Sequence, residues 1–93
     1  MDEKMVFKRN PDVVTRQIGD EVILLPLYQT EPDCNYIYTL NETAAAIWEL
    51  IDGKNTLGQI KEELMNGFEV SERILEKELD TFTRDMKSIK AIL

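Results

Sequence analysis

The chain has few side chains that could perform catalysis. It contains no histidine and a single cysteine, Cys34. Without histidine, Ser-His-Asp and Cys-His catalysis are excluded, and one cysteine supplies neither an internal disulfide nor a zinc site. Neither of the glycine-rich phosphate-binding motifs, G-x-G-x-x-G and G-x-x-x-x-G-K, occurs in the sequence. These residue types predict a protein that is not an enzyme and binds no metal or cofactor, with Cys34 as a small half-buried residue.

The chemistry that remains is binding through aromatic rings and the backbone. Tyr36 and Tyr38 alternate with Asn35, Ile37 and Thr39, which is typical of a short strand. A strand at the edge of a sheet can pair with an extended peptide, and tyrosine combines an apolar ring with a polar hydroxyl. Alternating tyrosines are also typical of half-buried structural positions, so both interpretations stay open.

Length and composition limit the possible classes of protein. A chain of 93 residues has room for one thin hydrophobic core, so a partner or a homodimer would add stability. With 43% hydrophobic and 31% charged residues, the chain is neither disordered nor membrane-like. No apolar run approaches the roughly 18 residues of a membrane span. The start, Met1-Asp2-Glu3-Lys4, does not resemble a signal peptide. A cytoplasmic location is therefore expected.

The net charge of −7 is spread along the chain. Residues 1–40 carry four basic and seven acidic side chains, and residues 41–93 carry seven and eleven. Neither part is basic, which argues against nucleic acid and anionic membranes as partners.

The first half of the chain predicts a β-hairpin and a third strand. Val13 to Ile18 and Val22 to Leu27 are rich in β-branched residues, and Gly19-Asp20 between them suits a two-residue turn. Pro26 has no backbone N–H to donate, so one of the strand pairings must end or form a β-bulge there. This turn places Val14 opposite Leu25. The residues expected on the core face of the second strand are Ile23, Leu25 and Leu27.

The second half predicts three helices with N-caps at Asn41, Thr56 and Ser71. Gln59 completes a capping box with Thr56. The third helix is expected to run from Ser71 to the C-terminal residues. Apolar residues recur at helical spacing at Ala44, Ile47, Trp48 and Ile51, at Leu57, Ile60 and Leu64, and at Leu75, Leu79, Phe82, Met86 and Ile89. Trp48 is expected as a core anchor. This order of elements predicts an α+β, winged-helix-like fold, a three-stranded antiparallel sheet followed by a three-helix cluster.

The segment "YTLNETAAAIWELIDGKNTLGQIKEEL" resembles the signature of the PqqD family, named for pyrroloquinoline quinone biosynthesis protein D. The similarity spans residues 12–93 and is most specific over residues 39–64. Residues 1–11 are then an N-terminal arm that Met5 and Phe7 could pin to the core. The shared pattern comprises Leu40-Asn41, Ala44 to Ala46, Ile47-Trp48, Asp52-Gly53, Thr56, Ile60 and Leu64.

The resemblance implies a non-catalytic recognition element, or peptide chaperone, for a ribosomally synthesised precursor peptide. Such a protein binds the leader segment as a strand added to its third strand, beside the third helix, and presents it to a modifying enzyme, often of the radical S-adenosylmethionine type. The implied peptide-binding residues are Asn35, Tyr36, Ile37, Tyr38, Thr39, Phe82, Thr83, Met86, Lys87 and Lys90. Either of two flanks of the third helix could face the peptide. One flank carries Ile74, Glu78 and Asp85, and the other carries Thr83, Lys87 and Lys90.

Two other interpretations compete with peptide recognition. The second and third helices with their short connection imitate a DNA-binding winged helix. However, the third helix carries five acidic and five basic residues between Glu72 and Lys90, so it is neutral. A structural interaction subunit without a peptide ligand is the other alternative.

We predict no measurable affinity for duplex DNA at physiological salt, because a neutral third helix on an acidic protein cannot engage phosphates well. A gel-shift titration at micromolar protein checks this. A shifted band that weakens as salt is added would support the winged-helix interpretation instead.

Overall fold

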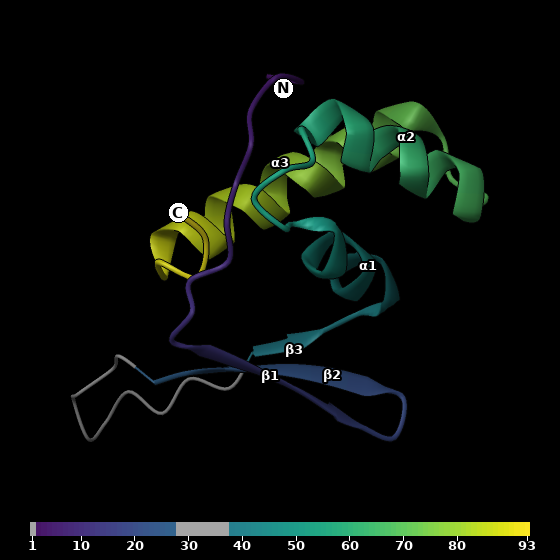
Figure 1. Cartoon of the computed structure of the whole chain (residues 1–93). Helices are drawn as coiled ribbons and strands as arrows, with labels where there is room; N and C mark the ends of the chain where they lie inside the picture. The colour runs from purple at the N-terminus through teal and green to yellow at the C-terminus, as the bar shows by residue number, and fades with distance from the viewer. Residues whose placement is uncertain (1, 28–37) are drawn as a thin grey trace.

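The computed structural model describes residues 2–27 and 38–93. Three strands, β1 (Val13–Ile18), β2 (Glu21–Pro26) and β3 (Tyr38–Leu40), precede three helices, α1 (Glu42–Leu50), α2 (Leu57–Gly67) and α3 (Glu72–Ser88). The helices lie together on one face of the sheet (Figure 1). This arrangement confirms the predicted α+β fold. The predicted strand residues Asn35, Tyr36 and Ile37, and also Cys34, lie outside the described residues.

The sheet is antiparallel, in the order β1-β2-β3. Val14 pairs with Leu25, which confirms the predicted hairpin register. Gly19 opens the turn with φ +61°, a value that glycine adopts without steric cost. β2 pairs with β3 from Val22 to Leu24. Among the described strands, β3 therefore forms one edge of the sheet.

The predicted core face of β2 is wrong. Leu24 is fully buried and Val22 packs against the core, whereas Leu27 follows the strand and is 66% exposed. Ile23 and Leu25 occupy the opposite face and are half-buried. Because four consecutive residues of this strand are apolar, its alternation does not identify the buried side.

Side-chain caps begin the three helices as predicted. Asn41 Oδ1 accepts a hydrogen bond from the Ala44 N–H at 2.8 Å. Thr56 and Gln59 form the reciprocal capping box that starts α2. The Ser71 hydroxyl accepts from the Ile74 N–H at 3.3 Å. Each cap satisfies an N–H group that the helix itself leaves without a partner.

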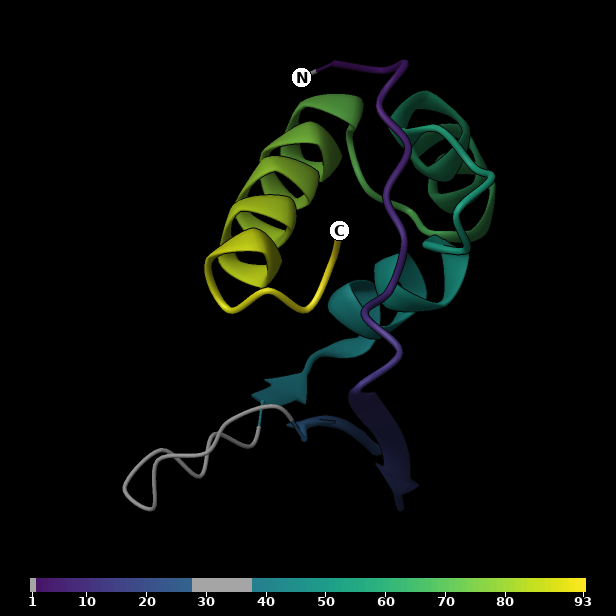
Figure 2. The same ribbon diagram turned by 60° about the vertical axis from the view of Figure 1, so that its left-hand side comes forward.

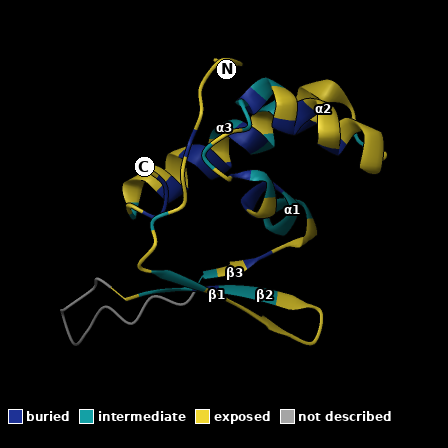
Figure 3. Ribbon diagram, viewed as in Figure 1, coloured by how far each residue is buried: buried dark blue, intermediate teal, exposed yellow. Residues whose placement is uncertain are grey.

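Trp48 joins the first helix to the sheet. Its side chain is 1% exposed, and its indole N–H donates to the Thr15 hydroxyl on β1 at 2.8 Å. The Arg9 guanidinium lies 5.6 Å from the centre of the indole ring. Ile47 and Ile51 are buried in the same core. Figure 3 shows buried segments in all three helices. These contacts confirm Trp48 as a core anchor.

The third helix ends earlier than predicted. α3 stops at Ser88, and Lys90 adopts the left-handed conformation with φ 61°. The Ala91 N–H donates to the Met86 carbonyl and the Lys90 N–H to the Lys87 carbonyl, the hydrogen-bond pattern of a Schellman cap. Lysine stands where such caps usually carry glycine, so no glycine marked the helix end. Beyond it, Ala91 and Ile92 fold back and are buried.

The N-terminal segment runs along the helices and meets the C-terminal residues (Figure 2). The Leu57 N–H donates to the Met5 carbonyl at 2.9 Å, and Lys8 and Leu93 exchange two backbone hydrogen bonds. Phe7 is 6% exposed, whereas Met5 is 40% exposed. Phe7 and these backbone bonds therefore hold the segment in place.

Lys61 forms a charged cluster that joins the N-terminal segment to α2 and α3. Its ammonium group donates to Glu3, and to Glu72 and Glu76 at 3.0 Å each. These hydrogen bonds raise the pKa of Lys61, the one to Glu3 most strongly. The Lys61 hydrogen bond in turn lowers the pKa of the Glu3 carboxyl below its usual 4.5.

No helix of the described residues is long and apolar enough to cross a lipid bilayer.

Replacing Trp48 by alanine should lower the free energy of unfolding by about 3–5 kcal/mol, because it leaves a cavity between the sheet and α1. Chemical denaturation followed by circular dichroism measures the change. Glu49→Ala, at the exposed next position, is the control and should stay within about 0.5 kcal/mol of the wild type. Equal midpoints for both variants would contradict the anchoring role of Trp48.

Glu3→Gln should destabilise the protein at neutral pH and lose that effect in acid. The Glu3 pKa is lower in the folded state, so its contribution to stability is present above pH 4.5 and disappears as the pH falls through the lowered value. Denaturation midpoints of both proteins between neutral and acid pH should therefore converge at the acid end. Parallel curves would show that ionisation of Glu3 contributes nothing.

Candidate functional site

A groove with a volume of about 510 Å³ lies between α1 and α3. Ala44, Ile47 and Phe82 provide apolar walls, and Ile74 adds an apolar side chain that is 54% exposed. The groove also includes Asn41, the residue that directly follows β3. The groove thus runs from the residue after the edge strand along α3.

The polar residues of the groove come mainly from one flank of α3. They are Lys77, Glu78, Thr81 and Asp85, together with the cap residue Asn41. The lining contains two carboxylates, those of Glu78 and Asp85, and one ammonium group, that of Lys77, so the net charge of the groove is negative. The structure therefore associates the groove with the flank of Ile74, Glu78 and Asp85.

Phe82 and Met86 lie at the boundary between core and groove. Phe82 lines the groove yet is only 7% exposed, and Met86, which is 4% exposed, belongs to the core. Thr83 is buried, and its hydroxyl donates to the carbonyls of Leu79 and Asp80 in its own helix. Of these three predicted residues, only Phe82 lines the groove.

The two predicted lysines lie near the N-terminal segment. The Lys87 ammonium is 4.9 Å from the centre of the Phe7 ring, a cation–π contact. The Lys90 carbonyl accepts from the Asn10 side chain at 2.9 Å. Neither lysine lines the groove between α1 and α3.

The two described residues of the predicted strand site point to opposite faces of the sheet. Tyr38 pairs with Leu24, shares its inward face and packs against the core. Thr39 is exposed on the outer face. Tyr38 is therefore half-buried, as the structural interpretation expects, and a contact with a peptide stays a prediction.

Several groove residues lie outside the site predicted from the sequence. Ala44 and Ile47 were assigned to the core alone, and Ile74 was only an alternative. The helical spacing of Ile74, Glu78, Thr81 and Asp85 could have identified this flank of α3. Each of these residues directly precedes a residue of the core stripe of α3. This spacing defines the flank but gives no indication of which neighbouring element the flank faces.

The Asp-Gly pair of the family signature builds a turn. The Asp52 carboxylate accepts from the N–H groups of Asn55 and Lys54 at 2.8 Å each, and these bonds lower its pKa. Gly53 has φ +82° and donates its N–H to the Phe7 carbonyl. The Asn55 side chain donates to the Leu50 carbonyl at 3.0 Å. These residues connect α1 to α2 and anchor the N-terminal segment.

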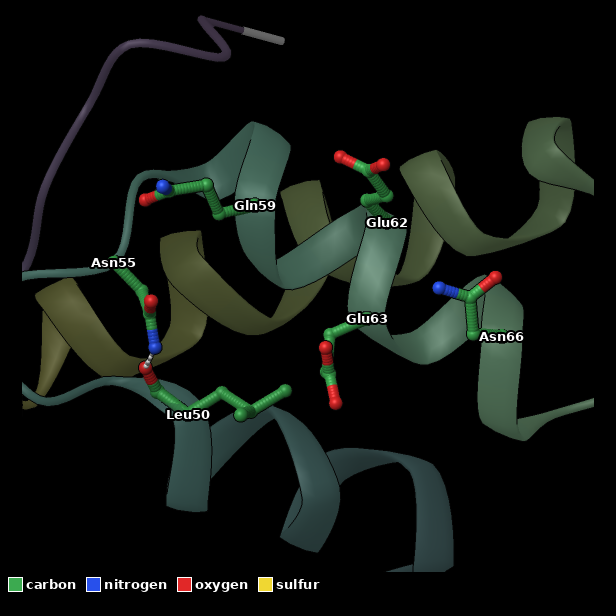
Figure 4. A pocket seen from close by; sticks show the side chains of 6 residues that line it. All are labelled: Leu50, Asn55, Gln59, Glu62, Glu63 and Asn66. Atoms are coloured by element: carbon green, nitrogen blue, oxygen red, sulfur yellow. Dashed lines mark hydrogen bonds between the residues drawn. The ribbon is translucent and has the colours of Figure 1, made fainter.

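A separate, polar groove lies between α1 and α2 (Figure 4). Its lining residues are Leu50, Asn55, Gln59, Glu62, Glu63 and Asn66. Leu50 is the only apolar side chain among them, so this surface offers little apolar area to a peptide. Within the described part of the chain, no group of three or more histidine, cysteine, aspartate or glutamate side chains is arranged to hold a metal ion.

The sequence matches the family model described as coenzyme PQQ synthesis protein D (PqqD) over residues 21–92. The chain therefore belongs to the PqqD family, and the resemblance seen in the sequence is confirmed. A comparison with curated proteins found no match.

Two solved structures share the fold. One is a lasso peptide synthetase B1 complexed with the leader peptide, with a TM-score of 0.77, 19% identity, and 96% of this chain and 99% of that chain covered. The other is TbiB1 in complex with the TbiA(beta) leader peptide, with a TM-score of 0.75, 24% identity, and coverage of 91% and 93%.

Proposed function

We propose that this protein binds the leader segment of a ribosomally synthesised precursor peptide and carries out no chemistry itself. The observation that carries the proposal is the apolar groove between α1 and α3, which begins at the residue after edge strand β3. An edge strand can accept a further strand, while a neighbouring groove selects side chains. Membership of the PqqD family and the leader-bound proteins of the same fold support this function.

The peptide would contact the groove flank of α3. An apolar leader side chain would lie against Ala44, Ile74 and Phe82, and its backbone would pair along β3. Glu78 and Asp85 would favour a basic residue beside that anchor, because complementary charges speed encounter and fix the register. In this binding mode Thr83, Lys87 and Lys90 have no contact with the leader.

The leader would then be presented to a peptide-modifying enzyme. The family resemblance favours a radical S-adenosylmethionine enzyme as that partner. In such a complex this protein supplies recognition, and the enzyme supplies the catalytic groups and cofactors.

Titration with the leader of the precursor peptide from this protein's own pathway should shift the amide resonances of β3, α3 and the Ala44 side of α1. Shifts confined to α2 and the N-terminal segment would contradict the proposed site. Ile74→Glu should weaken leader binding by about tenfold. Ile74 is 54% exposed, so its loss removes about half of the roughly 1.5–3 kcal/mol of a full isoleucine burial, and the new carboxylate would be covered by the apolar leader side chain.

Met65→Glu is the matched control for this variant. Met65 is 39% exposed on α2 and does not line the groove, so leader affinity should stay at the wild-type value. Equal affinities of the two variants would exclude the groove as the leader site.

A further inference from the structure

A second groove lies on the other side of α1, between that helix and the turn of the hairpin. Its volume is about 480 Å³. The apolar part consists of Val22, Leu40, Ala45, Ala46 and Phe68. Leu40 is buried, and the other four are half-buried and pack against the core. The groove thus has an apolar floor that belongs to the folded core and is open to solvent above.

The charges around this floor all have the same sign. Asp20 from the hairpin turn and Glu42 and Glu49 from α1 line the groove, and all three are exposed. None of the described residues that line it is basic. Like charges repel, so three carboxylates around apolar surface fit a ligand that carries lysine or arginine beside an apolar side chain.

The two grooves use different sides of the same helix. An α-helix turns by about 100° per residue, so Ala44 and Ile47 point away from the side that carries Glu42 and Glu49. Only Asn41, at the N-cap, lines both grooves. A ligand in one groove therefore leaves the other accessible.

We infer that this second groove docks a basic, partly apolar segment of the peptide-modifying enzyme while the leader occupies the groove between α1 and α3. The inference rests on the proposed function for the identity of the partner. A second copy of this chain fits less well, because a protein of net charge −7 would place further negative charge against the carboxylates.

The test uses the full chain together with the purified modifying enzyme and the leader peptide of its own biosynthetic pathway. The double variant Glu42→Lys, Glu49→Lys should weaken enzyme binding by about tenfold or more and reduce its salt dependence. Its leader affinity should remain within about twofold of the wild type, because the two grooves are separate. Calorimetric titration measures both affinities, and circular dichroism confirms that the variant is folded.

The matched control is Glu62→Lys, Glu63→Lys on α2. It makes the same change in net charge at two exposed glutamates outside the second groove. Enzyme binding should stay close to that of the wild type. An equal loss in both double variants would show a general charge effect and overturn the docking site.

Three further results would also overturn the inference. They are full enzyme affinity of the Glu42, Glu49 variant, loss of leader binding in that variant, and no binding of the enzyme to the wild-type protein. Self-association of the wild type that the variant abolishes, seen by sedimentation, would assign the groove to a second copy. Leader binding to the wild type tests the proposed function separately, so the two ideas can fail independently.

Discussion

Burial of Trp48 is the constraint on which the arrangement of this protein depends. A short helix of nine residues has little stability of its own, so α1 needs tertiary contacts to hold its position. The indole ring supplies apolar area, and its N–H reaches Thr15 on β1, which fixes both the distance and the direction of α1 relative to the sheet. The walls that α1 contributes to both grooves are positioned by this contact.

The three alanines of α1 explain why grooves exist on both sides of the helix. Ala44 lines the groove toward α3, and Ala45 and Ala46 line the groove toward the hairpin. Larger apolar side chains at these positions would fill the space that a ligand needs. Alanine also has the highest helix propensity, so the small side chains form the helix without blocking the surface. In this chain the three alanines therefore keep both grooves open while they form the helix.

Local chemistry made much of the fold predictable. The caps at Asn41, Thr56 and Ser71 and the glycine turn of the hairpin act over a few residues, so the sequence alone identifies them. The buried face of β2 was missed because both faces are apolar, and the inward one is set by contacts between distant parts of the chain, such as that of Trp48 with Thr15, which pairs with Leu24. The end of α3 was missed because Lys90 takes the conformation that glycine usually marks. The groove flank depends on contacts far apart in the chain, so helical spacing could not select it.

The N-terminal segment explains which flank of α3 remains available. Phe7 lies against the Lys87 side of the helix, and Asn10 binds the backbone at Lys90. The basic residues of that flank thus lie against the protein's own N-terminal segment. The opposite flank, with Glu78 and Asp85, faces the groove. Since the second groove is also bordered by carboxylates, both surfaces favour cationic, partly apolar ligands. Leader and enzyme segment would then differ less in charge than in the apolar surface that each one meets, because the first groove offers Ile74 and Phe82 of α3 and the second offers Leu40 and Phe68.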